Sequence, residues 1–175
     1  NDDIATDFVA QRPGELDYRP PAMRRFLSQA GVAAGVEIGI QPGNISQITG
    51  VDVWVNPENT DMEMARFHDP TISGTIRYLG ASWRRGYGDS DDMVFRKLLE
   101  EISRKWGVER PVPDGAVFLA DSGRLRRTNG VQKIAHVACL EPADSSVPGR
   151  GYELVDDVRS SVENTLATID AANRG

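Results

Sequence analysis

The sequence predicts an α/β fold, a three-layer sandwich in which a mixed central sheet carries helices on both faces. Three observations lead to this class. Apolar runs typical of strands are interspersed with segments of helical periodicity, the chain has no internal repeats, and 39% of its 175 residues are hydrophobic. A chain of this size can bury one core, so we expect one domain over residues 20–175 after an N-terminal arm or linker over residues 1–19.

The first part of the predicted domain contains a short helix and two strands. Residues 20–31 are typical of a helix, because prolines open the segment, a glycine closes it and the apolar residues share a face. Residues 35–41 alternate apolar and other side chains as a half-buried strand does. Residues 51–55 form a second, more apolar strand.

The next predicted elements are two helices. In the first, over residues 69–80, Asp69 is suited to the N-cap, Pro70 to the first helical position and Gly80 to the end of the helix. A second helix over residues 90–106 has an apolar stripe, which consists of Phe95, Leu98, Leu99, Ile102 and Trp106.

Two further strands and a last helix complete the prediction. The runs GAVFLA and KIAHVAC are typical of core strands and are separated by a segment rich in turn residues. The last helix lies near residues 156–172, with apolar residues at spacings of three and four: Val155, Val158, Val162, Leu166 and Ile169. We expect one sheet to bury Ile38, Val53, Val55, Phe118, Ile134 and Val137.

Charge and composition exclude several kinds of partner. A net charge of −6 and a pI near 5.0 disfavour nucleic acid and anionic membranes as partners, because both attract clustered positive charge. The opening residues are acidic, unlike a signal peptide, and no apolar stretch approaches the length of a membrane span. The single cysteine, Cys139, lies in an apolar run and is expected to be a buried, inert thiol. We therefore expect a cytoplasmic protein without metal or cofactor.

Polar residues follow the first two predicted strands, at the point where each strand ends. Asn44 lies in the turn after the first strand, and Asn56, Glu58 and Asn59 follow the second around Pro57. In open α/β sheets ligands bind where such loops converge, and side-chain amides suit sugar hydroxyls and base edges. The alternative is that these asparagines only stabilise tight turns.

Four segments, in order, resemble the macro domain, an α/β module that binds ADP-ribose. They are GNIS at residues 43–46, VDVWVNPEN at residues 51–59, ISGTIRYLGA at residues 72–81 and KIAHVAC at residues 133–139. The family has a GDIT-like turn, a strand of the form DAIVNAAN, a glycine-rich loop that opens a helix, and a later strand ending in IIHVV. The resemblance covers the chain from about Gly35 onward.

The resemblance implies a set of ligand-binding residues. Asn44 stands where the family has the aspartate that binds the adenine amino group, Ile45 would line the adenine slot, and Asn59 would lie near the distal ribose. His136 matches a strand histidine, for which we expect a structural role. The full expected set is Asn44, Ile45, Asn56, Asn59, Thr71, Ile72 and Ser73.

The chain departs from the family at both phosphate loops. Asp69, Pro70 and Thr71 replace the glycine run, so we expect Asp69 to cap the helix and to weaken ADP-ribose binding, with a gain when these three residues become glycine. The strand and loop that would follow the last helix do not occur before Gly175. A longer chain or another chain is expected to complete the sheet.

The function favoured by the sequence is a divergent macro-like module that binds ADP-ribose or another NAD-derived nucleotide, in a bacterial regulatory or defence protein. The arginine-rich, lysine-poor composition is typical of GC-rich bacterial genomes. One alternative is an interaction scaffold with a vestigial pocket, suggested by Tyr78, Trp83 and Tyr87. Another is an ADP-ribosyl hydrolase that acts through Asn59 and a water, with Glu58 or Asp61 as the base.

Overall fold

The computed structural model describes residues 24–27, 37–40, 43–83, 90–142, 152–155 and 157–174. The chain divides into two compact units, Asn1–Ile48 and Thr49–Gly175. The predicted arm over residues 1–19 lies outside the described residues. Within the described residues, none of the helices has the length and apolar character needed to cross a membrane.

The first unit contains a two-stranded sheet. Strand β1 (Arg24–Leu27) pairs antiparallel with β2 (Glu37–Ile40), and the 3-10 helix η2 (Ile45–Gln47) follows. β2 confirms the strand predicted over residues 35–41. The helix predicted over residues 20–31 is wrong at its centre, because Arg24–Leu27 is extended. A short apolar run fits either a strand or a helix, and here pairing with β2 decides in favour of the strand.

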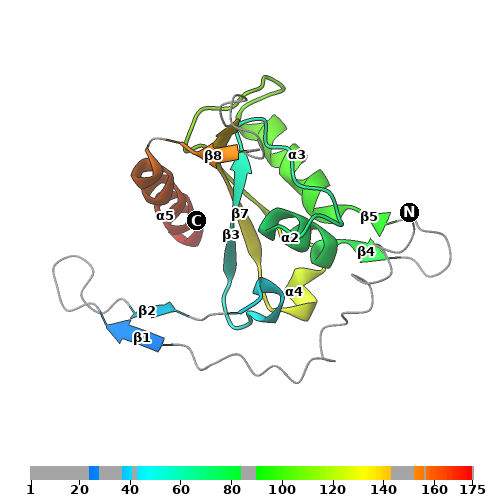
Figure 1. Ribbon diagram of the computed structural model, residues 1–175, viewed down its shortest axis with the longest axis vertical. Coiled ribbons are helices and arrows are strands. Elements are labelled where there is room, and N and C mark those ends of the chain that lie inside the picture. Colours follow the sequence, from blue (N-terminus) through cyan, green and yellow to red (C-terminus); the bar gives the residue numbers. More distant parts are fainter. Residues whose placement is uncertain are drawn as a thin grey trace. The chain divides into compact units, whose positions relative to one another are not determined.

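The second unit is built on a mixed sheet, as predicted (Figure 1). Strand β3 (Val53–Asn59) is parallel to β7 (Lys133–Pro142), and β6 (Val117–Asp121) is antiparallel to β7 on its other side. β8 (Tyr152–Leu154) pairs antiparallel with the end of β7. Residues 134–139 of β7 are all buried, so both faces of this central strand are covered.

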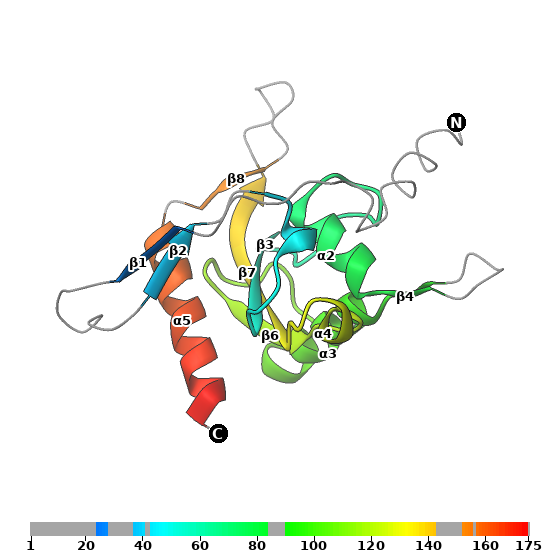
Figure 2. The same ribbon diagram turned by 90° about the horizontal axis from the view of Figure 1, so that it is seen from below.

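Helices of the second unit lie on both sides of β7. Helix α2 (Ile72–Gly80) contacts β3 and α3 (Met93–Lys105), while α3 contacts β6. The long helix α5 (Val158–Arg174) contacts β6 and β7 on the opposite side from α2 and α3 (Figures 1 and 2). The remaining elements are the short helix α4 (Leu125–Thr128) and a small hairpin of β4 (Ser82–Trp83) and β5 (Ser90–Asp91).

The core predicted for the sheet is confirmed in part. Phe118, Ile134 and Val137 are buried, as expected. The prediction that Val55 is buried is wrong, because 48% of this residue is exposed. Trp54 instead points inward, and α5 lies over β6 and β7 and leaves the Val55 side of β3 open. Ile38 belongs to the two-stranded sheet of the first unit.

Helix α5 turns a different face to the sheet from the one predicted. Its buried residues are Ser161 and Thr165, whereas the expected apolar stripe is exposed at Val158, Val162 and Leu166. The Thr165 hydroxyl donates to the Ser161 carbonyl, whereas the buried Ser161 hydroxyl has no hydrogen-bond partner among the described residues. Periodicity identified the helix but not the face that packs.

Helix α3 follows its predicted stripe only in part. Leu98 and Ile102 are buried together with Val94, whereas Leu99 and Trp106 are exposed. The helix begins after Asp92, whose carboxylate accepts a hydrogen bond from the Phe95 backbone N–H. The buried stripe of α3 therefore lies nearer to Val94 than the sequence pattern indicated.

Close packing of α2 on α3 depends on Gly80. A Cβ atom at this position would lie 2.2 Å from Cγ2 of Val94, so the two helices meet at a distance that only glycine allows.

We expect Gly80→Ala to lower the free energy of unfolding by about 1–3 kcal/mol through overpacking, measured by urea denaturation. In the double variant with Val94→Ala the loss should be smaller than the sum of the two single losses. Strict additivity would contradict this contact.

Candidate functional site

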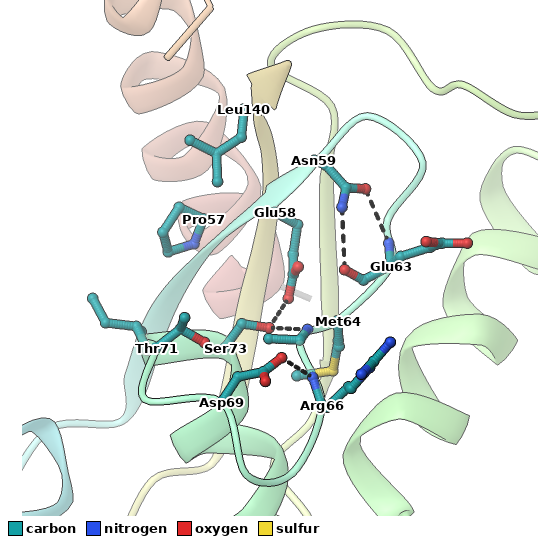
Figure 3. A pocket seen from close by; sticks show the side chains of 12 residues that line it. Pro57, Glu58, Asn59, Glu63, Met64, Arg66, Asp69, Thr71, Ser73 and Leu140 are labelled. Carbon is teal, nitrogen blue, oxygen red and sulfur yellow. Dashed lines mark hydrogen bonds between the residues drawn. The ribbon is translucent and has the colours of Figure 1, made fainter. Parts of the chain in front are cut away.

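A pocket of about 520 Å³ lies beside the carboxyl ends of β3 and β7, at the N-terminus of α2 (Figure 3). Ligand sites of α/β proteins occur at such places, and the volume falls within the usual range for small-molecule sites. Pro57 and Leu140 make an apolar part of its wall. The other lining residues are Glu58, Asn59, Glu63, Met64, Ala65, Arg66, Asp69, Thr71, Ile72 and Ser73.

Strand β3 is longer than predicted and includes the polar residues that were expected to form a loop. It continues to Asn59, and Asn56 and Glu58 point to the same side as Trp54 because side chains alternate along a strand. Both polar side chains are almost fully buried, with Asn56 at 0% and Glu58 at 2% exposure. Pro57 is accommodated because, among the described strands, β3 pairs with β7 alone.

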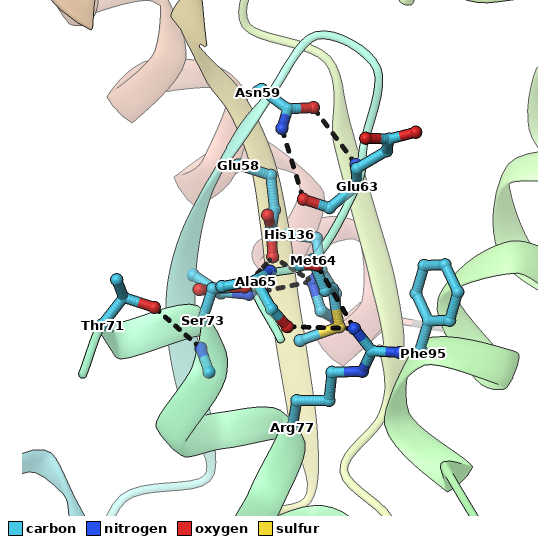
Figure 4. A network of polar contacts seen from close by, with 12 residues as sticks. Glu58, Asn59, Glu63, Met64, Ala65, Thr71, Ser73, Arg77, Phe95 and His136 are labelled. Atoms are coloured by element: carbon cyan, nitrogen blue, oxygen red, sulfur yellow. Dashed lines mark hydrogen bonds and ion pairs between the residues drawn. The ribbon is translucent and has the colours of Figure 1, made fainter. Parts of the chain in front are cut away.

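The buried Glu58 carboxyl group is the centre of a hydrogen-bond network (Figure 4). Its Oε1 atom accepts hydrogen bonds from Nδ2 of Asn56 and from the Ser73 hydroxyl, at 2.5 and 2.7 Å. The Ser73 oxygen in turn accepts a hydrogen bond from the Ala65 backbone N–H at 3.1 Å. The network therefore joins β3, the first turn of α2 and the loop that precedes α2.

His136 ends this network on the β7 side. Its Nδ1 atom is 3.2 Å from Nδ2 of Asn56, which has a second hydrogen to donate. An amide nitrogen can only donate, so Nδ1 is the acceptor in this contact. His136 is fully buried, which agrees with the structural role expected for it.

The two carboxyl oxygens of Glu58 differ in their partners. Among the described residues, Oε2 has no hydrogen-bond partner, while Oε1 has two. Glu58 lines the pocket although only 2% of the residue is exposed (Figure 3). The pocket thus contains a hydrogen-bond acceptor held in a fixed position.

Asn59 shapes the loop that follows β3. Its Oδ1 accepts a hydrogen bond from the Glu63 backbone N–H, and its Nδ2 donates to the Glu63 carbonyl, at 3.1 and 3.2 Å. Between these residues Met62 has a left-handed backbone with φ of 56°, which costs about 1–2 kcal/mol for a non-glycine residue. The side chain of Met62 is buried, which holds this strained turn in place.

The segment before α2 is tightly wound, and its cap differs from the prediction. Thr71, rather than Asp69, is the N-cap: its hydroxyl oxygen accepts a hydrogen bond from the Gly74 N–H at 3.0 Å. The Asp69 carboxylate accepts from the Arg66 N–H at 2.8 Å and so closes a turn of its own. The prediction that Asp69 caps α2 and thereby hinders phosphate binding is therefore wrong about the cap. Because Thr71 is the N-cap, replacing residue 71 by glycine would remove the cap.

Glycine at residue 74 allows this winding. A Cβ atom there would lie 2.4 Å from the Asp69 carbonyl oxygen and 2.8 Å from that of Arg66. These are backbone atoms that cannot move aside without displacing the pocket wall. The close approach brings the Arg66–Asp69 turn against the first turn of α2.

Two backbone donors remain at the start of α2. Gly74 N–H is bound by Thr71 Oγ1 and Thr75 N–H by the Thr71 carbonyl. Within the described part of the chain, the N–H groups of Ile72 and Ser73 have no acceptor. Both residues line the pocket, so the start of α2 forms part of its wall.

Arg77 anchors the pocket loop to α3. Its guanidinium donates to the carbonyls of Met64 and Ala65, at 3.3 and 3.0 Å, and to the Asp92 carboxylate at 2.7 Å. The same group lies over the rings of Phe67 and Phe95, 4.8 and 4.7 Å from their centres. This residue fixes the wall that faces Ser73 (Figure 4).

Charge in the pocket is mixed. Glu58, Glu63 and Asp69 are acidic lining residues, and Arg66 is a basic one. Among the described residues, no group of three or more His, Cys, Asp or Glu side chains is arranged to hold a metal ion.

Cys139 lies outside the lining of the pocket, and burial raises the pKa of its thiol, which agrees with the buried, inert cysteine expected from the sequence.

The residues expected to bind the ligand are only partly brought together. Asn59, Thr71, Ile72 and Ser73 line the pocket. Asn56 is buried behind it in the Glu58 network. Asn44 and Ile45 belong to the first unit, where the Asn44 Oδ1 accepts a hydrogen bond from the Ser46 N–H. A crevice shared by Asn44 and Asn59 therefore stays a prediction.

The sequence reasoning missed the central role of Glu58, which it treated as an exposed loop carboxylate. The signal was present: Trp54, Asn56 and Glu58 have the spacing of one strand face, with the large apolar residue marking the inward side. Asp61, the other carboxylate considered as a base, is exposed as a loop residue.

Comparison of the chain with protein-family models, with curated proteins and with solved structures gave no match.

Removing the donor that holds Glu58 should destabilise the fold. We expect Asn56→Ala to cost about 2–4 kcal/mol in urea denaturation, because it removes one of the two donors to the buried Glu58 carboxyl group and the partner of the buried His136 imidazole. Asn164→Ala is a matched control, since its amide makes one part-buried hydrogen bond to the Gly115 carbonyl. The control should cost about 1 kcal/mol or less. Equal losses of stability in the two variants would show that the Glu58 network contributes no more than a single part-buried hydrogen bond.

Proposed function

We propose that this chain is a macro-like module that binds ADP-ribose or another NAD-derived nucleotide in a bacterial regulatory or defence protein. A three-layer sandwich of the macro type is part of the proposal. The observation that carries it is the lining of one pocket, which includes the acidic Glu58 and, at a helix N-terminus, Ile72 and Ser73, whose N–H groups have no acceptor among the described residues.

These two kinds of group suit the two chemistries of such a ligand. Backbone N–H groups at a helix N-terminus favour phosphate oxygens, and a carboxylate oxygen favours a sugar hydroxyl. The apolar contribution of Pro57 and Leu140 supplies a surface for the carbon skeleton of the sugar. The four ordered sequence segments that resemble the macro domain support the same ligand class.

The hydrolase alternative has less in its favour. Asn59, the residue on which it depended, uses both of its amide atoms to hold the Glu63 backbone. No arrangement of Asn59 and a base follows from these contacts. Binding without hydrolysis is therefore the function that the geometry supports best.

A specific observation favours the scaffold as a second candidate. Trp83 is 39% exposed, and its ring contacts those of Tyr78 and Phe67 at centre distances of 4.9 and 5.5 Å. Exposed aromatic groups of this kind are enriched at protein interfaces. Tyr87, the third member of the predicted aromatic group, lies outside the described residues.

Titration calorimetry with ADP-ribose, ADP and NAD tests the binding proposal, and an absence of heat with all three would remove it. We expect Ile72→Glu to weaken binding by about fivefold or more, since a like charge a few Å from a phosphate costs about 1–4 kcal/mol. Leu99→Glu is the matched control, because Ile72 and Leu99 are both apolar helix residues, 47% and 43% exposed, and Leu99 lies outside the pocket. The control should bind as the wild type does.

The scaffold candidate has a separate test in affinity capture of partner proteins. Trp83→Ala should abolish capture of a specific partner while the thermal unfolding midpoint stays close to that of the wild type. Trp106→Ala is the control, since Trp106 is a similarly exposed tryptophan, 46% exposed, at the end of α3. Equal capture by both variants would exclude the aromatic surface as the interface.

A further inference from the structure

We propose that two copies of this chain associate through α5, as an antiparallel pair of helices related by a twofold axis. The observation that carries the proposal is an apolar stripe on α5 that stays open: Val158, Val162 and Leu166 are 37%, 53% and 63% exposed. These residues lie outside the lining of the pocket, so the proposal does not depend on the proposed function.

The stripe runs along one side of the helix. Its three members follow one another at intervals of four residues, so they lie on successive turns, and Ile169, which is half-buried, continues the line. The side of α5 that packs on β6 and β7 is a different one and contains Ser161 and Thr165. Single exposed apolar residues are ordinary, whereas a contiguous row of them marks an interaction surface.

The charges of α5 favour another protein helix over a membrane as the occupant of this surface. The charged residues of the helix are Arg159, Glu163, Asp170 and Arg174, all exposed, so positive and negative charges balance. Helices that lie on anionic membranes are instead rich in Lys and Arg on their polar face. An apolar stripe beside charges of both signs is typical of helices that pair with helices.

The apolar stripe is complementary to itself in one register. In an antiparallel pair centred halfway between Val162 and Leu166, Val162 of each copy lies opposite Leu166 of the other. The same register places Val158 of each copy opposite Ile169 of the other. The stripe can therefore be covered by a second copy over its whole length, because a twofold contact uses the same patch twice.

The charged edge beside the stripe matches in this register as well. Arg159 and Asp170 lie on the same side of α5, about three helical turns apart. A twofold axis between antiparallel helices brings the same edge of both copies together, so Arg159 of each copy faces Asp170 of the other. Opposite charges then meet at both ends of the contact, which favours a second copy over an unrelated helix.

Sedimentation equilibrium of the chain over a range of concentrations tests the association. A contact of one helix per copy is small, so we expect a weak dimer with a dissociation constant of about 1–100 μM. Leu166→Glu should raise this constant by about thirtyfold or more, because each dimer contains the residue twice. Leu99→Glu is the matched control, a helix leucine that is 43% exposed on α3, and should leave the constant within about twofold of the wild type.

Reversal of the charges tests the register. Arg159→Asp and Asp170→Arg should each raise the dissociation constant by about twofold to thirtyfold at low salt, because each places like charges opposite one another at two points of the dimer. The double variant restores opposite charges and should dimerise more tightly than either single variant. Both residues are exposed and the new charges suit the helix ends, so the thermal unfolding midpoint should stay close to that of the wild type.

Three results would each overturn the proposal. One is a wild type that stays monomeric up to about 1 mM, well above the expected dissociation constant. Another is a Leu166→Glu variant that dimerises as the wild type does, which would place the contact on another surface. The third is a double charge variant that dimerises no better than the single variants, which would exclude the antiparallel pairing of α5.

Discussion

The carboxyl group of Glu58, buried on a strand, is the constraint on which the rest of the second unit depends. An enclosed carboxyl group is tolerated only when hydrogen-bond donors surround it, and here they come from different elements: Asn56 from β3 itself and Ser73 from α2. The first turn of α2 must therefore lie against β3. His136 extends the same requirement to β7, which is parallel to β3.

The pocket follows from satisfying this group. Ser73 can reach Glu58 only if α2 begins beside the end of β3, and the loop between them must then fold back over the helix. Asn59 closes the first part of that loop on Glu63, and the Asp69 carboxylate closes the last part on Arg66. Gly74 allows the two to meet, because any side chain there would collide with backbone oxygens. The space left between strand ends, loop and helix is the pocket.

The described network uses only part of the polar atoms of Glu58 and Ser73. Glu58 stabilises the network through Oε1, and Ser73 uses its hydroxyl, while Oε2 and the Ser73 N–H have no partner among the described residues. Arg77 adds rigidity without entering the pocket, since it binds the carbonyls of Met64 and Ala65 from the α3 side. A site built in this way is rigid, which favours discrimination between ligands that differ by one polar group.

The sequence by itself determined the elements whose residues carry local information. The strands β2, β6 and β7 and the helices α2, α3 and α5 follow from periodicity and end signals. Only the tertiary structure decided which faces pack. Val55 and the Val158–Leu166 stripe are exposed, while Asn56 and Glu58 are buried because His136 and Ser73, which bind them, lie far away in sequence or on another element. The N-cap was decided in the same way: Asp69 and Thr71 are both suited to it, and the turn that Asp69 forms with Arg66 leaves the cap to Thr71.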